Sequence, residues 1–261
     1  MNYHLSGKTA LVAASSQGLG KAIAEALVKE GANVAITSRS EEKLMQVQEE
    51  LSQLQKGRVV YIAGDITSSE DIARIVEKTV TEFGTLDILI NNAGGPPAGS
   101  FESLSDTEWQ NSFELNLLSY IRLIREALPH MKKNGGRIVN IASSSIKEPI
   151  PGLILSNTFR TAIVGLSKTL ASELAPYNIL INTAAPGRIA TDRVRHLDEV
   201  NAEKSGQPVE TVEEKMKGQI PLGRYGRPEE FANVVAFLVS DANTYMTGSS
   251  FLIDGGMVKS I

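Results

Sequence analysis

The chain has 261 residues, of which 42% are hydrophobic and 21% are charged, with a formal net charge of −4 and no cysteine. These proportions are ordinary for a globular protein and exclude the disordered and fibrous classes. The absence of cysteine excludes a disulfide scaffold, a thiol nucleophile and a thiolate metal site.

The patterns of charge and hydropathy also exclude some classes of binding partner. No run of lysine and arginine forms a basic stripe, so nucleic acid and acidic membrane surfaces are poor partners. The N-terminal segment 1–8 lacks the pattern of a signal peptide, and no stretch approaches the roughly 18 apolar residues that a membrane helix needs. We therefore expect a cytoplasmic protein that binds neither nucleic acid nor membrane.

Short runs rich in β-branched residues alternate along the chain with segments of helical periodicity. Strands are predicted over 9–13, 34–37, 59–62, 86–90, 137–141, 179–182 and 250–253. Helices are predicted over 20–29, 41–55, 69–83, 106–133, 161–175 and 228–239. This alternation is typical of βαβ units. The sequence therefore predicts one α/β domain over 1–261, a Rossmann-type doubly wound parallel sheet of about seven strands.

The segment 188–218 differs from the rest of the chain. It is highly charged, contains Gly206 and Pro208, and has weak apolar periodicity. Long loops in compact domains are usually functional or disordered. We interpret this segment as a mobile lid or a short helical excursion.

A loop of small residues joins the first predicted strand to the first predicted helix. It consists of Ala14, Ser15, Ser16, Gln17, Gly18, Leu19 and Gly20. A backbone that turns sharply into a helix can present free N–H groups and the positive helix end to a pyrophosphate. Two glycines alone can simply close a turn, but the strand–loop–helix order favours a dinucleotide site.

The end of the second predicted strand indicates which form of the dinucleotide the site would bind. An acidic residue there would bind a ribose 2′-hydroxyl and repel a 2′-phosphate. This chain instead has Ser38, Arg39 and Ser40. A guanidinium flanked by hydroxyls suits a phosphate, although Arg39 could also lie at a solvated helix start. We expect NADP(H) to be favoured over NAD(H).

Further motifs follow in the order and spacing of a known family, and the chain resembles the short-chain dehydrogenases/reductases, in particular their 3-oxoacyl-acyl-carrier-protein reductase branch. These motifs are Asp65, Asn91-Asn92-Ala93-Gly94, Asn116, Ser143, Pro186-Gly187, the run 224–230 and the run 254–256. The resemblance implies hydride transfer between a nicotinamide and a carbonyl or hydroxyl compound, such as a 3-oxoacyl thioester. It also implies a homodimer or homotetramer built through the helices that begin near 106 and 161.

The resemblance assigns cofactor contacts along the strand ends, namely to Asp65, Ile66, Asn92, Ala93, Gly94, Pro186, Gly187, Ile189 and Thr191. It implies that Asp65 binds the adenine amino group, and that Ile189 and Thr191 meet the nicotinamide amide. Asp65 could instead cap the following helix, and Asn91-Asn92 could be a strand-ending turn, while Asn91 is also expected to link neighbouring strands.

The family's catalytic tyrosine and lysine are replaced. Counted from Ser143 with the family's spacing, their positions hold Ser156 and Arg160. A serine hydroxyl is a much weaker acid than a phenol, whose pKa is about 10, and arginine is a poor proton shuttle. Arg160 could still bind the nicotinamide ribose. The resemblance implies Asn116, Ser143, Ser156 and Arg160 as the candidate catalytic residues.

No tyrosine lies between Tyr120 and Tyr177 to restore the phenol. Alternative proton donors by position are Lys147, Glu148, Asp192 and His196. No histidine or carboxylate cluster has metal-ligand spacing, and no Gly-x-Ser-x-Gly elbow occurs.

The loop also departs from the family, because Ala13 and Ala14 replace its Thr-Gly and alanine disfavours positive φ. We therefore expect a tilted loop or weaker cofactor binding. Two hypotheses stay open: an NADP(H)-dependent oxidoreductase with altered acid chemistry, or a dinucleotide-binding or scaffolding protein with little turnover.

Overall fold

Seven parallel strands form one sheet in the computed structural model, which describes residues 3–260. Residues 1, 2 and 261 of the predicted domain, and with them the start of the N-terminal segment, lie outside the described part. The strands are β1 (Thr9–Val12), β2 (Asn33–Ser38), β3 (Val59–Ala63), β4 (Ile88–Asn91), β5 (Gly136–Ile141), β6 (Ile179–Pro186) and β7 (Ser250–Ile253). Their order is β3-β2-β1-β4-β5-β6-β7, which confirms the predicted Rossmann-type α/β fold.

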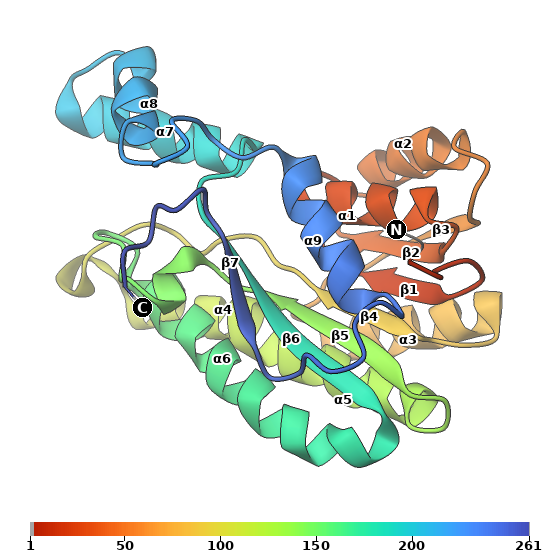
Figure 1. The fold of residues 1–261 in the computed structure, drawn as a ribbon. Coiled ribbons are helices and arrows are strands. Elements are labelled where there is room, and N and C mark those ends of the chain that lie inside the picture. Colours follow the sequence, from red (N-terminus) through yellow and green to blue (C-terminus); the bar gives the residue numbers. More distant parts are fainter. Residues whose placement is uncertain (1–2, 261) are drawn as a thin grey trace.

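Helices cover both faces of this sheet (Figure 1). The helices are α1 (Gly18–Lys29), α2 (Glu41–Ser52), α3 (Ser69–Phe83), α4 (Asp106–Phe113), α5 (Ser119–Met131), α6 (Ile154–Leu174), α7 (Asp192–Ser205), α8 (Val209–Lys217) and α9 (Pro228–Val239). Helices α1, α2 and α9 contribute to the core on one face, and α3, α5 and α6 contribute to the core on the other. The central strands β1 and β4 are mostly apolar because both of their faces are buried.

The topology places a switch point between β1 and β4, where the chain reverses its direction of winding. Leu11 of β1 pairs with Ala35 of β2 on one side and with Leu89 of β4 on the other. The loops that follow these two strands therefore diverge to opposite faces of the sheet. Ligands of open α/β sheets bind in the crevice at such a point, beyond the carboxyl ends of the strands.

Two predicted helices differ from the structure. The helix predicted over 106–133 is divided by a π-helical turn, Glu114–Leu118, between α4 and α5. Helix α6 begins at Ile154 rather than at 161, and its N-cap Leu153 offers no capping side chain. The sequence before it, Pro149 to Gly152, also indicates a loop, so the usual signals for a helix start are missing here.

The segment 188–218 forms the two helices α7 and α8, which project beyond the sheet (Figure 1). Helix α7 buries only Asp198 and Ala202, which explains its weak apolar periodicity. The segment is therefore helical, and its action as a lid stays a prediction. None of the helices described is both long and apolar enough to cross a membrane.

Candidate active site

A cavity of about 1250 Å³ opens at the carboxyl ends of the strands, beside the switch point. Its walls come from the loop after β1, the ends of β2, β3, β4, β5 and β6, the segment 188–218 and the C-terminal residues 257–259. Pockets for single drug-sized molecules measure about 300–1,000 Å³. This cavity therefore has room for a large ligand together with a small one.

Most of the residues singled out from the sequence line this cavity. They are Ala14, Ser16, Gln17, Leu19, Ser38, Arg39, Asp65, Ile66, Asn92, Ala93, Gly94, Ser143, Ser156, Arg160, Pro186, Gly187, Ile189 and Thr191. The lining does not include Ser15, Gly18, Gly20 or Asn116. The fold thus gathers side chains from across the whole sequence at one edge of the sheet.

The loop before α1 is held from inside the protein. Ser15 is fully buried; its Oγ donates to the Val12 carbonyl at 2.8 Å and accepts from the Thr37 N–H at 2.9 Å. Its side chain therefore ties the loop to β2 rather than facing a ligand. At Gly20 an added Cβ would lie 2.4 Å from the Ala14 carbonyl oxygen, so this helix start packs directly on the loop.

Ala14 itself adopts φ +48°, in the left-handed region. An L-residue pays about 1–2 kcal/mol for this conformation. The loop therefore makes a turn that suits glycine, and the alanine bears the strain. Behind the turn, the first N–H groups of α1 have no partner within the helix and form a site for an anion.

Two cations stand at the end of β2. Arg39 is exposed and forms no ion pair with any residue from 3 to 260. Lys43, on the first turn of α2, also lines the cavity, and its Nζ donates to Gln17 Oε1 at 2.9 Å. Ser40 is the N-cap of α2, so the helix start predicted for this run is also present. Sequence reasoning missed Lys43, although a cation four residues after Arg39 on a helix start was a usable signal.

Asparagines fix the strand ends around the cavity. Asn91 Nδ2 donates to Asn140 Oδ1 at 2.7 Å, which confirms the expected link between β4 and β5. Asn92 Nδ2 donates to the carbonyls of Ala13 and Ala14, at 3.3 and 3.2 Å. The loop after β4 therefore supports the loop after β1.

Asp65 lines the cavity, and its Oδ1 accepts hydrogen bonds from the N–H and the hydroxyl of Thr67. The N-cap of α3 is Ser68. The interpretation of Asp65 as the helix cap was therefore wrong, and its carboxylate keeps further acceptor capacity toward the cavity.

Arg160 is only 5% exposed and is held by oxygen atoms from three parts of the chain. Its Nη1 donates to Tyr120 Oη and to the Ile141 carbonyl, both at 2.8 Å, and its Nη2 donates to the Ala93 carbonyl at 3.1 Å. A guanidinium has five N–H groups, so these three bonds leave two for a ligand. Arg160 is thus both a structural link and part of the cavity wall.

The phenol beside Arg160 does not face the cavity. Tyr120 is fully buried in α5, and its hydroxyl donates to the Ile141 carbonyl at 2.9 Å. Burial raises the pKa of Tyr120, with Arg160 opposing that shift. This phenol therefore cannot donate a proton into the cavity.

The two serines at the positions counted from the family lie where the cavity meets β5 and α6. Ser143 follows β5 and Ser156 lies on the first turn of α6.

Asn116, in the π-helical turn, is fully buried, and neither of its side-chain polar atoms has a partner among the described residues. A buried amide of this kind requires a water or a ligand group to satisfy it.

The alternative proton donors are poorly placed. His196 is exposed on α7, lies 3.8 Å from Glu199 and does not line the cavity. Glu148 lines it, but its Oε1 accepts the backbone N–H groups of Lys259 and Ser260, at 2.8 and 2.7 Å. Lys147 and Asp192 are absent from the lining. Of the four, only Glu148 touches the cavity, and it holds the C-terminal residues in place.

A parallel sheet of this strand order, with a small-residue loop before α1 and a cavity at the switch point, defines a Rossmann-type nucleotide-binding protein. A family model described as enoyl-(acyl carrier protein) reductase matches residues 13–258. The chain belongs to the short-chain dehydrogenase/reductase family.

Similar proteins share nearly the whole length. The chain is 37% identical to a 3-oxoacyl-acyl-carrier-protein reductase of Aquifex aeolicus, over 98% of this chain and 100% of that protein. It is 35% identical to an NADPH-dependent reductase of Bacillus subtilis, again over 98% and 100%. The solved structure of L-sorbose reductase from Gluconobacter frateurii, complexed with NADPH and L-sorbose, has a TM-score of 0.95 and 33% identity over 100% of both chains.

Proposed function

We propose that this protein is an NADP(H)-dependent oxidoreductase that interconverts a carbonyl compound and the corresponding alcohol. The observation that carries the proposal is that one cavity joins the α1 N-terminus, the cationic end of β2, and Ser143 with Arg160. In the reducing direction the carbonyl carbon gains a hydride, which is a proton and two electrons, and the oxygen gains one further proton. The similar NADPH-dependent and NADPH-bound proteins support this assignment.

The residues present fit such a cofactor. The free N–H groups of α1 suit a pyrophosphate, and Arg39 and Lys43, without a competing carboxylate at the end of β2, suit a 2′-phosphate. Asp65 and Ile66 would meet the adenine, and Ile189 and Thr191 the nicotinamide amide. When bound, NADPH would supply the hydride.

Arg160 and the two serines would act on the substrate oxygen. The buried charge of Arg160 and its two remaining N–H groups would stabilise the negative charge that develops on that oxygen. The hydroxyls of Ser143 and Ser156 would hold the oxygen and a water molecule, which supplies the proton that tyrosine gives in the family. Loss of a positioned general acid costs roughly 100- to 10,000-fold in rate, so slow turnover is expected.

One observation favours a second function, that of a dinucleotide-binding or scaffolding protein with little turnover. Three of the five N–H groups of Arg160 bind protein oxygens, and the nearby Tyr120 hydroxyl lies outside the cavity. Both proposals predict NADPH binding, but only the first predicts its oxidation.

The decisive experiment is a sensitive NADPH-oxidation assay over a panel of ketones, aldehydes, sugars and a 3-oxoacyl thioester. Turnover of any of them supports the oxidoreductase, and NADPH binding without oxidation supports the alternative. Ser156→Tyr combined with Arg160→Lys restores the family's pair. Since a positioned acid contributes roughly 100-fold or more, the double variant should be faster; unchanged activity would mean that these positions do not face the reacting atoms.

We also propose that 188–218 acts as a lid and that the protein forms a homodimer or homotetramer. The lid proposal is supported by the cavity contacts of Val194, Leu197 and Met216. Self-association is supported by Leu166 and Leu170 of α6, which the core only partly buries. Light scattering on the purified protein tests the oligomer, and the cytoplasmic location remains a prediction.

A further inference from the structure

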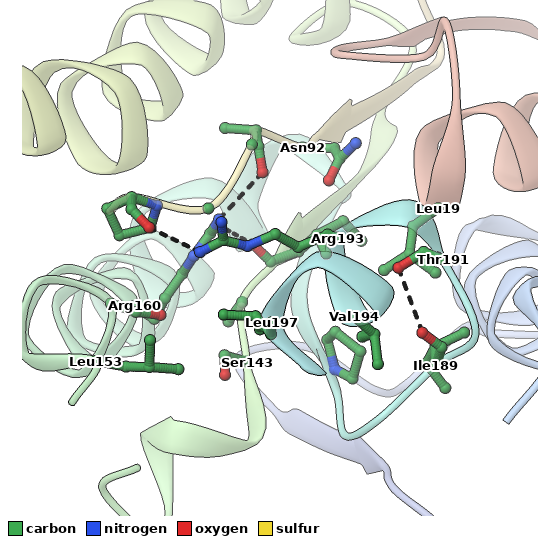
Figure 2. A pocket seen from close by; sticks show the side chains of 18 of the residues that line it. Leu19, Asn92, Ser143, Leu153, Arg160, Ile189, Thr191, Arg193, Val194 and Leu197 are labelled. Carbon is green, nitrogen blue, oxygen red and sulfur yellow. Dashed lines mark hydrogen bonds between the residues drawn. The ribbon is translucent and has the colours of Figure 1, made fainter. Parts of the chain in front are cut away.

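A second arginine reaches the cavity from the opposite wall. Arg193 lies on the first turn of α7, and its Nη2 donates to the Pro96 carbonyl at 2.7 Å. The guanidinium lies against the loop after β4, since a Cβ added at Gly95 would be 2.9 Å from its Nε. Figure 2 shows Arg160 from α6 and Arg193 from α7 extending into the same part of the pocket. Sequence reasoning missed Arg193 because this contact joins distant segments.

The charges of these two arginines are not compensated by the protein. Neither guanidinium forms an ion pair with a carboxylate in the part of the chain that the structure describes. Burial, and secondly the positive charge of Arg160, lower the pKa of Arg193. The two carboxylates that line the cavity are engaged elsewhere: Asp65 with Thr67, and Glu148 with the C-terminal backbone.

A buried and a half-buried cation that share one site are unfavourable unless an anion joins them. Arg193 uses one of its five N–H groups on Pro96, so its planar fork keeps enough donors for a bidentate bond to a carboxylate. The neighbouring wall is apolar, with Leu153, Val194 and Leu197 (Figure 2). The site thus offers a cationic anchor beside an apolar surface.

We infer that the substrate is an oxo acid, a carbonyl compound whose carboxylate binds Arg193 while its apolar part packs on helix α7. This inference rests on the proposed carbonyl reduction, since it names the substrate class for the same cavity. Arg193 is then the specificity-determining residue, and Arg160 serves the carbonyl oxygen. A cofactor phosphate has similar chemistry, but the α1 N-terminus and the Arg39–Lys43 pair already provide for phosphates at the other end.

The test compares acids with their ethyl esters, which differ in charge at nearly the same shape. The probes are 2-oxo-4-phenylbutanoate, 3-oxobutanoate and 4-oxopentanoate, each with its ester, added to the full chain. Calorimetry on the chain saturated with NADP+, which supplies no hydride, gives the affinity, and NADPH oxidation gives kcat/KM. At least one acid should bind about tenfold or more tightly than its ester, because the bond to a charged donor is lost in the ester.

Arg193→Gln should abolish this preference for the acid while the NADPH Kd stays unchanged, and Arg193→Lys should restore part of it. The matched control is Arg195→Gln, because Arg195 is 80% exposed and pairs with Glu199 away from the cavity. This control should leave both affinities unchanged.

Two results would overturn the inference. They are equal binding of acid and ester in all three pairs, and an acid preference that survives Arg193→Gln. If the surviving preference is accompanied by a weaker NADPH affinity in that variant, Arg193 belongs to the cofactor site. The proposed function fails separately: acids that bind without NADPH oxidation support the anionic site but refute reduction. Conversely, if the esters are reduced as fast as the acids, the proposed reduction is supported and the assignment of an oxo acid as the substrate is refuted.

Discussion

Replacing Arg39 by glutamine should weaken NADPH binding and leave NADH binding nearly unchanged. Arg39 is exposed and has no ion-pair partner among residues 3–260, so its removal breaks no internal interaction. The stability change should therefore stay within about 0.5 kcal/mol. A hydrogen bond to a charged group contributes about 1.5–3 kcal/mol, which corresponds to roughly 10- to 150-fold in the NADPH Kd.

The measurement is calorimetric titration of the wild type and Arg39→Gln with NADPH and with NADH at one fixed ionic strength. Lys56→Gln is the matched control, because Lys56 is an exposed cation that does not line the cavity. Raising the salt concentration should narrow the difference between the wild type and Arg39→Gln, since an exposed charge is screened. An NADPH Kd that does not change in Arg39→Gln, or an equal loss for both nucleotides, would refute the 2′-phosphate assignment.

Three further changes test other features. Ala14→Gly should raise the free energy of unfolding, measured by denaturant titration, by about 0.5–1 kcal/mol. Glycine relieves the strain of the left-handed conformation, and its greater freedom in the unfolded chain offsets only part of that gain. A lower free energy of unfolding in the variant would contradict this. Asp198→Asn breaks a buried ion pair with Arg188, worth about 3 kcal/mol, and should speed hydrogen exchange in α7 while β5 stays protected; unchanged exchange in α7 would refute the role of this pair. The pKa of Glu230 is lowered from 4.5 to about 2, first by its bond to Arg224, so its stabilising effect is present above pH 4.5 and lost as the pH falls toward 2; Glu230→Gln should flatten the acid-unfolding profile over that range, and an identical profile would refute the assignment.

The sheet could be predicted from the sequence because its signals are local. Each buried strand is largely an apolar run bounded by polar turns, and seven such runs correspond to β1–β7, although β6 extends to Pro186, beyond its predicted end at 182. Helix α9 was predicted with its observed bounds because Pro228 and two glutamates mark its start. The predicted start of helix α6, at 161, lies after the observed start at Ile154 because Leu153 offers no capping side chain. The sequence left open whether α7 is a helix because this segment buries so little apolar surface.

The site could be predicted only where a residue's role depends on its place after a strand. The glycine loop, Asp65 and Asn92 follow strands directly, so strand order was enough to bring them together. The environments of Arg160 and Arg193 depend on contacts over long sequence separations, with Tyr120 and Pro96 respectively, which no local pattern encodes. Asn116 was predicted, but the absence of partners for its amide was not visible without coordinates.

The bond network between Glu148 and the final residues has a practical consequence for handling the protein. Met257, Val258 and Lys259 form part of the cavity wall. An affinity tag attached beside them would therefore disturb that wall and change the ligand affinities that are measured. Purification handles belong at the other end of the chain. Conversely, a fluorophore attached at Lys259, an exposed residue of the cavity lining, could report ligand arrival in real time.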